Sequence, residues 1–85
     1  MENFIIENFM TAQLGLNGNQ LVLYAVLYKD TKGGKSPVKD DYTRYSSAMN
    51  VTAPTYYSTL KKLVERGIVF RKEQADGVSL NVVKR

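Results

Sequence analysis

The 85-residue sequence contains no cysteine and no histidine. This excludes disulfides, thiolate or imidazole metal ligands, cysteine nucleophiles and serine–histidine–aspartate triads within the chain. Asp40 and Asp41 are the only adjacent carboxylates, so no acid–base or nucleophile pair stands out. We therefore expect neither enzymatic activity, nor a cofactor, nor a metal site.

Long hydrophobic runs are also absent. The longest uninterrupted one covers eight residues, 21–28, whereas a membrane-spanning helix needs about 20. Glu2 and Glu7 stand where a secretory signal would carry positive charge. We expect no membrane segment and a cytoplasmic location.

Hydrophobic residues make up 44% of the chain, which is enough for a folded core. The length suits one small domain over residues 1–85. A chain of this size buries only about 60–65% of its unfolded surface, so its stability should be modest unless a partner covers more of it. Self-association is therefore expected.

The net charge of +4 lies entirely in the last 25 residues. Residues 1–60 contain five basic and five acidic residues, whereas residues 61–85 contain seven basic and three acidic ones. A segregated cationic excess suits a polyanion, because each Lys or Arg near a phosphate releases a condensed counterion. A merely solvated basic surface explains the charge equally well.

Hydrophobic periodicity and capping residues predict an extended lead-in over residues 1–16, three helices over residues 17–67 and a β-hairpin over residues 68–85. The first helix begins after Asn17 as N-cap, with Gln20 at the capping-box position, and ends near Asp30. It is hydrophobic on every face, so it must be covered on more than one side. Residues 33–37 are predicted to be a loop.

The second helix is predicted to be capped by Asp40 or Asp41 and to end at Asn50, which tolerates a left-handed conformation. Thr52 then caps the third helix, and Gly67 suits its C-terminal cap. The hydrophobic face of that helix contains Tyr56, Leu60 and Leu63. The opposite, polar face contains Pro54, Ser58, Lys61 and Glu65.

After Gly67 the hydrophobic period changes to two, and Asp76 followed by Gly77 is a strong hairpin signal. The fold class is therefore α+β, mostly α. Four tyrosines at helical core spacing are expected to be packing residues: Tyr24, Tyr28, Tyr42 and Tyr45.

Residues 45–69 resemble the helix-turn-helix of winged-helix DNA-binding domains. Tyr45 and Ser46 stand at the family's Leu-Ala pair, and Thr52 stands at its helix cap. The turn, core and wing-entry positions are occupied by Met49, Asn50, Val51, Leu60, Leu63, Gly67, Ile68 and Val69. Residues 8–28 are similar to the start of helix-turn-helix proteins of bacterial phages and mobile elements.

The resemblance implies a winged helix in which the third helix enters the DNA major groove and the hairpin wing follows the backbone. The DNA-contacting residues that it implies are Thr52, Ala53, Pro54, Tyr57, Ser58, Lys61, Lys62, Arg71 and Lys72. The family commonly has Arg or Lys at the positions of Ala53, Pro54 and Ser58. Their absence here predicts modest sequence discrimination, because no bidentate arginine contact to guanine is available there.

Double-stranded DNA is thus the expected partner, bound by a transcription regulator or by a replication module of a phage or mobile element. The alternative is a protein-interaction module on a winged-helix scaffold that does not bind DNA, favoured by the uncharged start of the third helix. A homodimer is expected through Phe4, Ile6, Phe9, Met10 and the first helix. Tyr57 suits either an exposed recognition role or a dimer contact.

Overall fold

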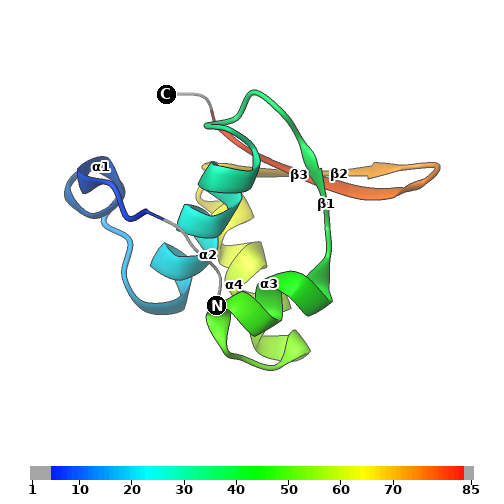
Figure 1. Ribbon diagram of the computed structural model, residues 1–85, viewed down its shortest axis with the longest axis horizontal. Coiled ribbons are helices and arrows are strands. Elements are labelled where there is room, and N and C mark those ends of the chain that lie inside the picture. The colour runs from blue at the N-terminus through cyan, green and yellow to red at the C-terminus, as the bar shows by residue number, and fades with distance from the viewer. Residues whose placement is uncertain (1–4, 84–85) are drawn as a thin grey trace.

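The computed structural model describes residues 5–83, which form four helices and a three-stranded antiparallel sheet (Figure 1). The helices are α1 (Asn8–Ala12), α2 (Gly18–Asp30), α3 (Tyr42–Met49) and α4 (Ala53–Glu65). The strands are β1 (Val38–Lys39), β2 (Val69–Gln74) and β3 (Gly77–Val82). The α+β class expected from the sequence is confirmed.

The central helix is α2, whose residues 23–27 are all at most 1% exposed. α1, α3, α4 and β3 pack against it. A helix that is hydrophobic on every face is therefore covered by its own chain, as its composition requires. Asn17 occupies the N-cap position of α2, although its side chain makes no capping hydrogen bond.

α3 and α4 are joined by a tight turn over residues 50–52. The Asp41 carboxylate accepts a hydrogen bond of 3.2 Å from the backbone N–H of Arg44 and so caps α3. Asn50 ends α3 in the left-handed conformation, at φ 58° and ψ 47°. α4 begins after Thr52, and Gly67 follows its end at φ 76°. These boundaries agree with the predictions from capping residues.

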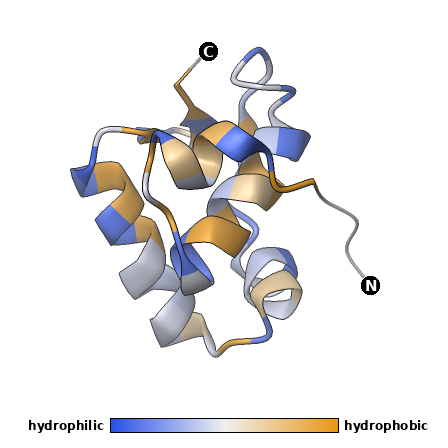
Figure 2. Ribbon diagram, turned by 90° about the vertical axis from the view of Figure 1, so that its left-hand side faces the viewer, coloured by the Kyte–Doolittle hydropathy of each residue, from blue (hydrophilic) through white to orange (hydrophobic). Residues whose placement is uncertain are grey.

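Hydrophobic and hydrophilic segments alternate along the helices, as Figure 2 shows by colour. Three tyrosines, Tyr24, Tyr45 and Tyr56, are among the largest fully buried side chains. Tyr28 packs against the same core. Tyr42, in contrast, is 49% exposed, so its expected packing role is wrong. It is the first residue of α3, and its ring lies against Tyr57 rather than in the core.

The sheet has the order β1-β3-β2, and the hairpin of β2 and β3 extends away from the helices (Figure 1). Its register runs from Val69 opposite Val82 to Gln74 opposite Gly77. Val69, Leu80 and Val82 are buried, at 1% exposure or less, so this face of the sheet packs on the helices.

The lead-in predicted to be extended contains helix α1. Met10 is fully buried, and the Phe9 ring lies 6.2 Å from that of Tyr24 and 5.3 Å from that of Tyr28. Contact with α2 thus stabilises a turn of helix that has no side-chain cap of its own.

A further correction concerns β1, which the sequence-based prediction missed. Val38 pairs with Leu80 and Lys39 pairs with Ser79, so the sheet has three strands rather than the two of the predicted hairpin. A two-residue strand carries no periodic signal of its own. It exists because a distant strand supplies its hydrogen-bonding partner.

The surface expected to form a homodimer is largely used within the chain. Met10 and residues 23–27 of α2 are buried and Phe9 packs on the core, while Phe4 lies outside the described residues. Ile6 is 48% exposed and its neighbour Ile5 is 76% exposed. Within residues 5–83, no helix is long and hydrophobic enough to cross a membrane.

Candidate nucleic-acid interface

The polar side of α4 faces outward along its whole length. Pro54, Ser58, Lys61 and Glu65 are all exposed, whereas Tyr56, Leu60 and Leu63 on the opposite side are at most 2% exposed. Spacings of three and four residues bring the exposed side chains onto one surface. The described part of the chain leaves this surface open to an incoming partner.

At the start of α4 the three residues expected to contact DNA differ in accessibility. Thr52 and Pro54 are exposed, but Ala53 is half-buried. The Thr52 hydroxyl group donates a hydrogen bond of 3.2 Å to Oγ1 of Thr55 rather than capping the helix backbone. Ala53 therefore offers less surface to a partner than its place in the resemblance implies.

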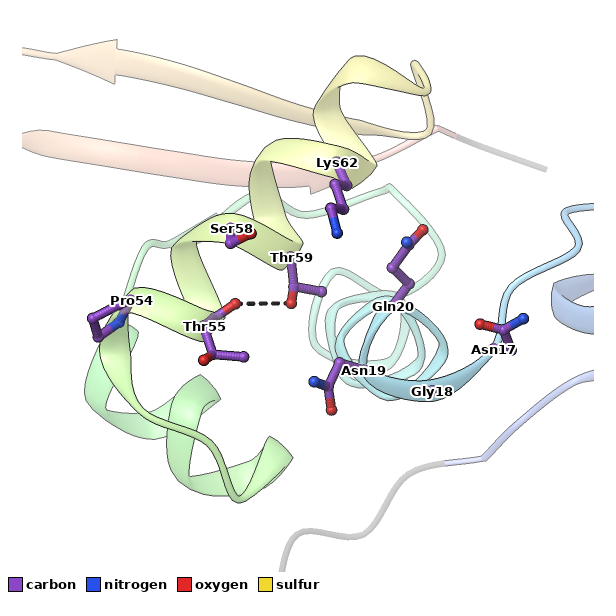
Figure 3. Close-up of a pocket in the computed structure, with 9 residues that line it drawn as sticks. All are labelled: Asn17, Gly18, Asn19, Gln20, Pro54, Thr55, Ser58, Thr59 and Lys62. Atoms are coloured by element: carbon purple, nitrogen blue, oxygen red, sulfur yellow. Dashed lines mark hydrogen bonds between the residues drawn. The ribbon is translucent and has the colours of Figure 1, made fainter.

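A polar groove of about 390 Å³ lies between α4 and the beginning of α2 (Figure 3). α4 contributes hydroxyl groups and an ammonium group, and α2 contributes the amides of Asn19 and Gln20. The lining residues are Asn17, Gly18, Asn19, Gln20, Pro54, Thr55, Ser58, Thr59 and Lys62. Three predicted site residues, Pro54, Ser58 and Lys62, thus share a surface with α2.

Sequence reasoning missed the α2 side of this groove. The sequence marks Asn17 and Gln20 only as helix-start residues, and nothing local in it indicates that they line a groove with α4. Gln20 Oε1 accepts a hydrogen bond of 3.3 Å from Arg66, whose guanidinium group also donates to the Leu14 carbonyl. Arg66 is therefore engaged in joining the end of α4 to the segment before α2.

The opposite flank of α4 carries an aromatic pair. Tyr57 is 44% exposed, and its ring centroid lies 6.1 Å from that of Tyr42, with the ring planes inclined by 32°. Tyr57 also packs edge-on against the buried Tyr56, at 5.0 Å and 61°. Lys61 stands one helical turn after Tyr57, so this flank combines aromatic and cationic groups.

The two predicted wing residues lie on opposite faces of the sheet. Arg71 pairs with the buried Leu80, so it is on the side that faces the helices. Lys72 pairs with Ser79, which also pairs with Lys39, so both lysines are on the outer face. The structure brings Arg71, but not Lys72, to the side of the sheet that carries α4.

Arg71 already has a partner within the hairpin. Its guanidinium group lies 3.2 Å from a carboxylate oxygen of Glu73, and both side chains are well exposed, at 40% and 76%. An exposed pair of this kind contributes about 0–1 kcal/mol. A phosphate group can therefore replace Glu73 as the partner of Arg71 at little cost.

Two tyrosine–aspartate pairs hold α3 and α4 in place. The Tyr45 hydroxyl group donates to Asp30 at 2.9 Å, and the same carboxylate accepts from the Arg44 guanidinium group. The rings of Tyr45 and Tyr56 are stacked at 6.3 Å, and Tyr56 in turn donates to Asp40. These hydrogen bonds and the ring stacking fix the position of α4, and with it the position of its exposed side, relative to α3.

These contacts shift the acidity of the groups involved. Burial, together with the hydrogen bond to an aspartate, raises the pKa of both Tyr45 and Tyr56 above the ordinary 10.0. Burial alone would raise the pKa of Asp30, but the hydrogen bonds from Arg44 and Tyr45 outweigh it and leave that pKa below 3.8. Asp30 is therefore ionised, and both phenols are neutral, at neutral pH.

Among residues 5–83 there is no group of three acidic side chains close enough to hold a metal ion. No protein-family model, curated protein or solved structure matches this chain.

Proposed function

We propose that this chain is a winged helix-turn-helix domain that binds double-stranded DNA, with α4 in the major groove and the β2–β3 hairpin against the neighbouring backbone. The observation that carries the proposal is the open polar side of α4, which no other described element covers. Support also comes from the three-residue turn between α3 and α4, which is the usual length in helix-turn-helix units.

The cations near α4 suit contacts to phosphates rather than to bases. Lys61 lies on the exposed side of α4, Lys62 lines the groove beside α2, and Arg71 lies on the α4 side of the sheet. Beside Lys62 the polar groove offers the Ser58 hydroxyl group and the amides of Asn19 and Gln20, which can donate to phosphate oxygens, whereas the Thr59 hydroxyl group already donates to the Thr55 carbonyl. Lys72 lies on the outer face of the sheet and is therefore less well placed than Arg71 for a duplex docked on α4.

The character of the exposed side predicts weak discrimination between sequences. Pro54 and Ser58 provide no guanidinium fork for guanine, and Ala53 is half-buried. Affinity then comes mainly from phosphate contacts, with small contributions from hydroxyl groups and thymine methyl contacts. Such a domain serves equally as a transcription regulator or as a replication module of a phage or mobile element.

The proposal is tested by titrating a labelled duplex at several salt concentrations. With about four cationic contacts, the logarithm of the association constant should fall with the logarithm of salt concentration with a slope of about −3 to −4. Lys61→Ala and Lys62→Ala should each reduce the magnitude of the slope by about 1. Lys35→Ala, which removes an equal charge from the loop at residues 33–37, is the matched control and should change the slope little.

A protein-interaction module is the second candidate, and the exposed Tyr42 and Tyr57 are the observation that favours it. No DNA binding even at low salt, with binding of a protein partner that Tyr57→Ala abolishes, would favour this candidate. The expected homodimer also stays a proposal, now through Ile5 and Ile6. Sedimentation tests this by comparing the wild-type protein with the Ile6→Ser variant. If both sediment as monomers at the same concentrations, the result counts against the homodimer.

A further inference from the structure

The Tyr42–Tyr57 pair is the feature that duplex binding by α4 leaves unexplained. Single exposed hydrophobic side chains are common on protein surfaces, but these two rings lie against each other while each stays nearly half exposed, at 49% and 44%. To form hydrogen bonds with base edges, the two tyrosines would need only their hydroxyl groups. The rings themselves present aromatic surface to the solvent.

Buried residues under the pair fix the position of its rings. Tyr57 packs edge-on against Tyr56, which is fully buried, hydrogen-bonded to Asp40 and stacked on Tyr45. Tyr42 and Tyr57 come from different helices, α3 and α4, whose relative position this buried network fixes. The exposed rings are therefore ordered before any partner arrives, which lowers the entropic cost of binding to them.

Positive charge lies beside the pair. Lys61 follows Tyr57 by one turn on α4. Burial and the charges of Asp40 and Tyr42 raise the pKa of the Tyr57 hydroxyl group, whereas the charge of Arg71 lowers it. Asp40 is occupied by the Tyr56 hydroxyl group, and Arg71 shares its charge with Glu73. Lys61 thus places a positive charge beside the aromatic pair.

We propose that Tyr42 and Tyr57 form a stacking site for an unpaired base, so that the preferred partner is DNA in which a duplex adjoins unpaired strand. This inference rests on the proposed DNA binding by α4 and specifies which kind of DNA the domain prefers. In a continuous duplex the base faces are covered by neighbouring pairs, and only base edges reach the grooves. An unpaired base exposes its face, and stacking on aromatic rings is the usual way in which proteins hold it.

The experiment compares three DNAs with equal numbers of phosphates: a blunt duplex, a duplex with a single-stranded tail, and a single strand. Binding is followed by fluorescence anisotropy at one salt concentration. The tailed duplex should bind about tenfold more tightly than the blunt duplex, the change expected of one stacked base. A 2-aminopurine at the first unpaired position should lose fluorescence on binding.

The variants Tyr57→Leu and Tyr42→Leu should each abolish the preference and the fluorescence loss, while Tyr57→Phe keeps both because the ring remains. Tyr42→Leu is the more robust test of the two, because the Tyr42 ring lies against Tyr57 on the surface, whereas Tyr57 also packs against the buried Tyr56. Lys61→Ala should weaken binding to blunt and tailed duplexes equally.

Equal affinity of the wild-type protein for the blunt and tailed duplexes would overturn this inference and leave duplex binding standing. A preference that survives both leucine variants would equally overturn the role of the tyrosine pair. Failure to bind any of the three DNAs would overturn the proposed function together with the inference.

Discussion

The hydroxyl group of Tyr56 donates a hydrogen bond of 2.5 Å to Oδ1 of Asp40, and so joins the buried side of α4 to the residue that follows β1. The Tyr56 side chain is fully buried, and its ring stacks on Tyr45 of α3. One residue of α4 therefore connects that helix both to α3 and to the strand that completes the sheet. The position of the exposed side of α4 depends on these contacts.

Replacing this tyrosine isolates the hydrogen bond. Tyr56→Phe keeps the stacked ring but removes the donor to a charged acceptor, so the free energy of unfolding should fall by about 1.5 kcal/mol. Urea denaturation measures this as a lower midpoint with an unchanged slope. Tyr57→Phe, whose hydroxyl group is on the exposed flank, is the control and should change stability by less than about 0.5 kcal/mol. Equal midpoints for the two variants would contradict the bridging role.

The protein should lose stability in alkali. The folded-state pKa values of Tyr45 and Tyr56 are raised above 10.0 by burial and by the adjacent aspartates, so the folded chain holds these protons longer than the unfolded chain. Stability from this source is complete below pH 10, declines as pH rises past that value, and is lost above the folded-state pKa values. Unfolding midpoints measured from pH 8 upward should show this decline.

The matched variant for the alkaline range is Tyr45→Phe. It lacks one of the two tyrosine hydroxyl groups whose pKa is raised, so its stability should fall less steeply above pH 10 than that of the wild type. A parallel fall in both proteins would mean that Tyr45 is not held in the neutral form by its contacts with Asp30.

The ionisation of Asp30 affects the stability of the protein at acidic pH. Its pKa is lowered in the folded state, so its contribution is present above the unfolded value of 3.8 and is lost as pH falls through the lower folded-state pKa. Asp30→Asn should therefore be less stable than wild type at pH 7, and the difference should shrink as pH falls below 3.8. Denaturant titrations at pH 7, 4 and 2.5 measure this convergence, and a constant difference would argue against the ion pair with Arg44.

Glu65 is the one acidic residue on the exposed side of α4, one turn after Lys61. Glu65→Gln removes its repulsion of phosphates, and at about 8 Å in water this change is worth about 0.5 kcal/mol, or about twofold in affinity. The gain should shrink at high salt. Glu7→Gln, a charge-matched change outside α4, is the control. Weaker DNA binding by Glu65→Gln would place the DNA elsewhere.

Local signals in the sequence were sufficient for most of the fold. Asp41, Asn50 and Gly67 set the ends of α3 and α4 through their own backbone conformation or a hydrogen bond three residues away, so their effects can be read from neighbouring residues. α1 and β1 could not be found in this way. Their stability comes from Tyr24 and Tyr28 in one case and from Leu80 and Ser79 in the other, all distant in sequence.

The candidate site divides in the same way. Helical periodicity was enough to place Ser58 and Lys61 on the exposed side of α4, and the period of two already put Arg71 and Lys72 on opposite faces of a strand. The contact of Tyr42 with Tyr57, and the groove between α2 and α4, depend on how separate helices pack. No spacing within a single element reports such an arrangement.

The central claim is that the exposed side of α4 contacts DNA, and residue-resolved NMR tests it most directly. A uniformly labelled sample is titrated with a short duplex while backbone amide shifts are followed. The account predicts that the largest changes occur at Ser58, Lys61, Lys62 and Arg71, with little change at Lys35. Changes confined to Ile5, Ile6 and Phe70, or no changes at low salt, would contradict it.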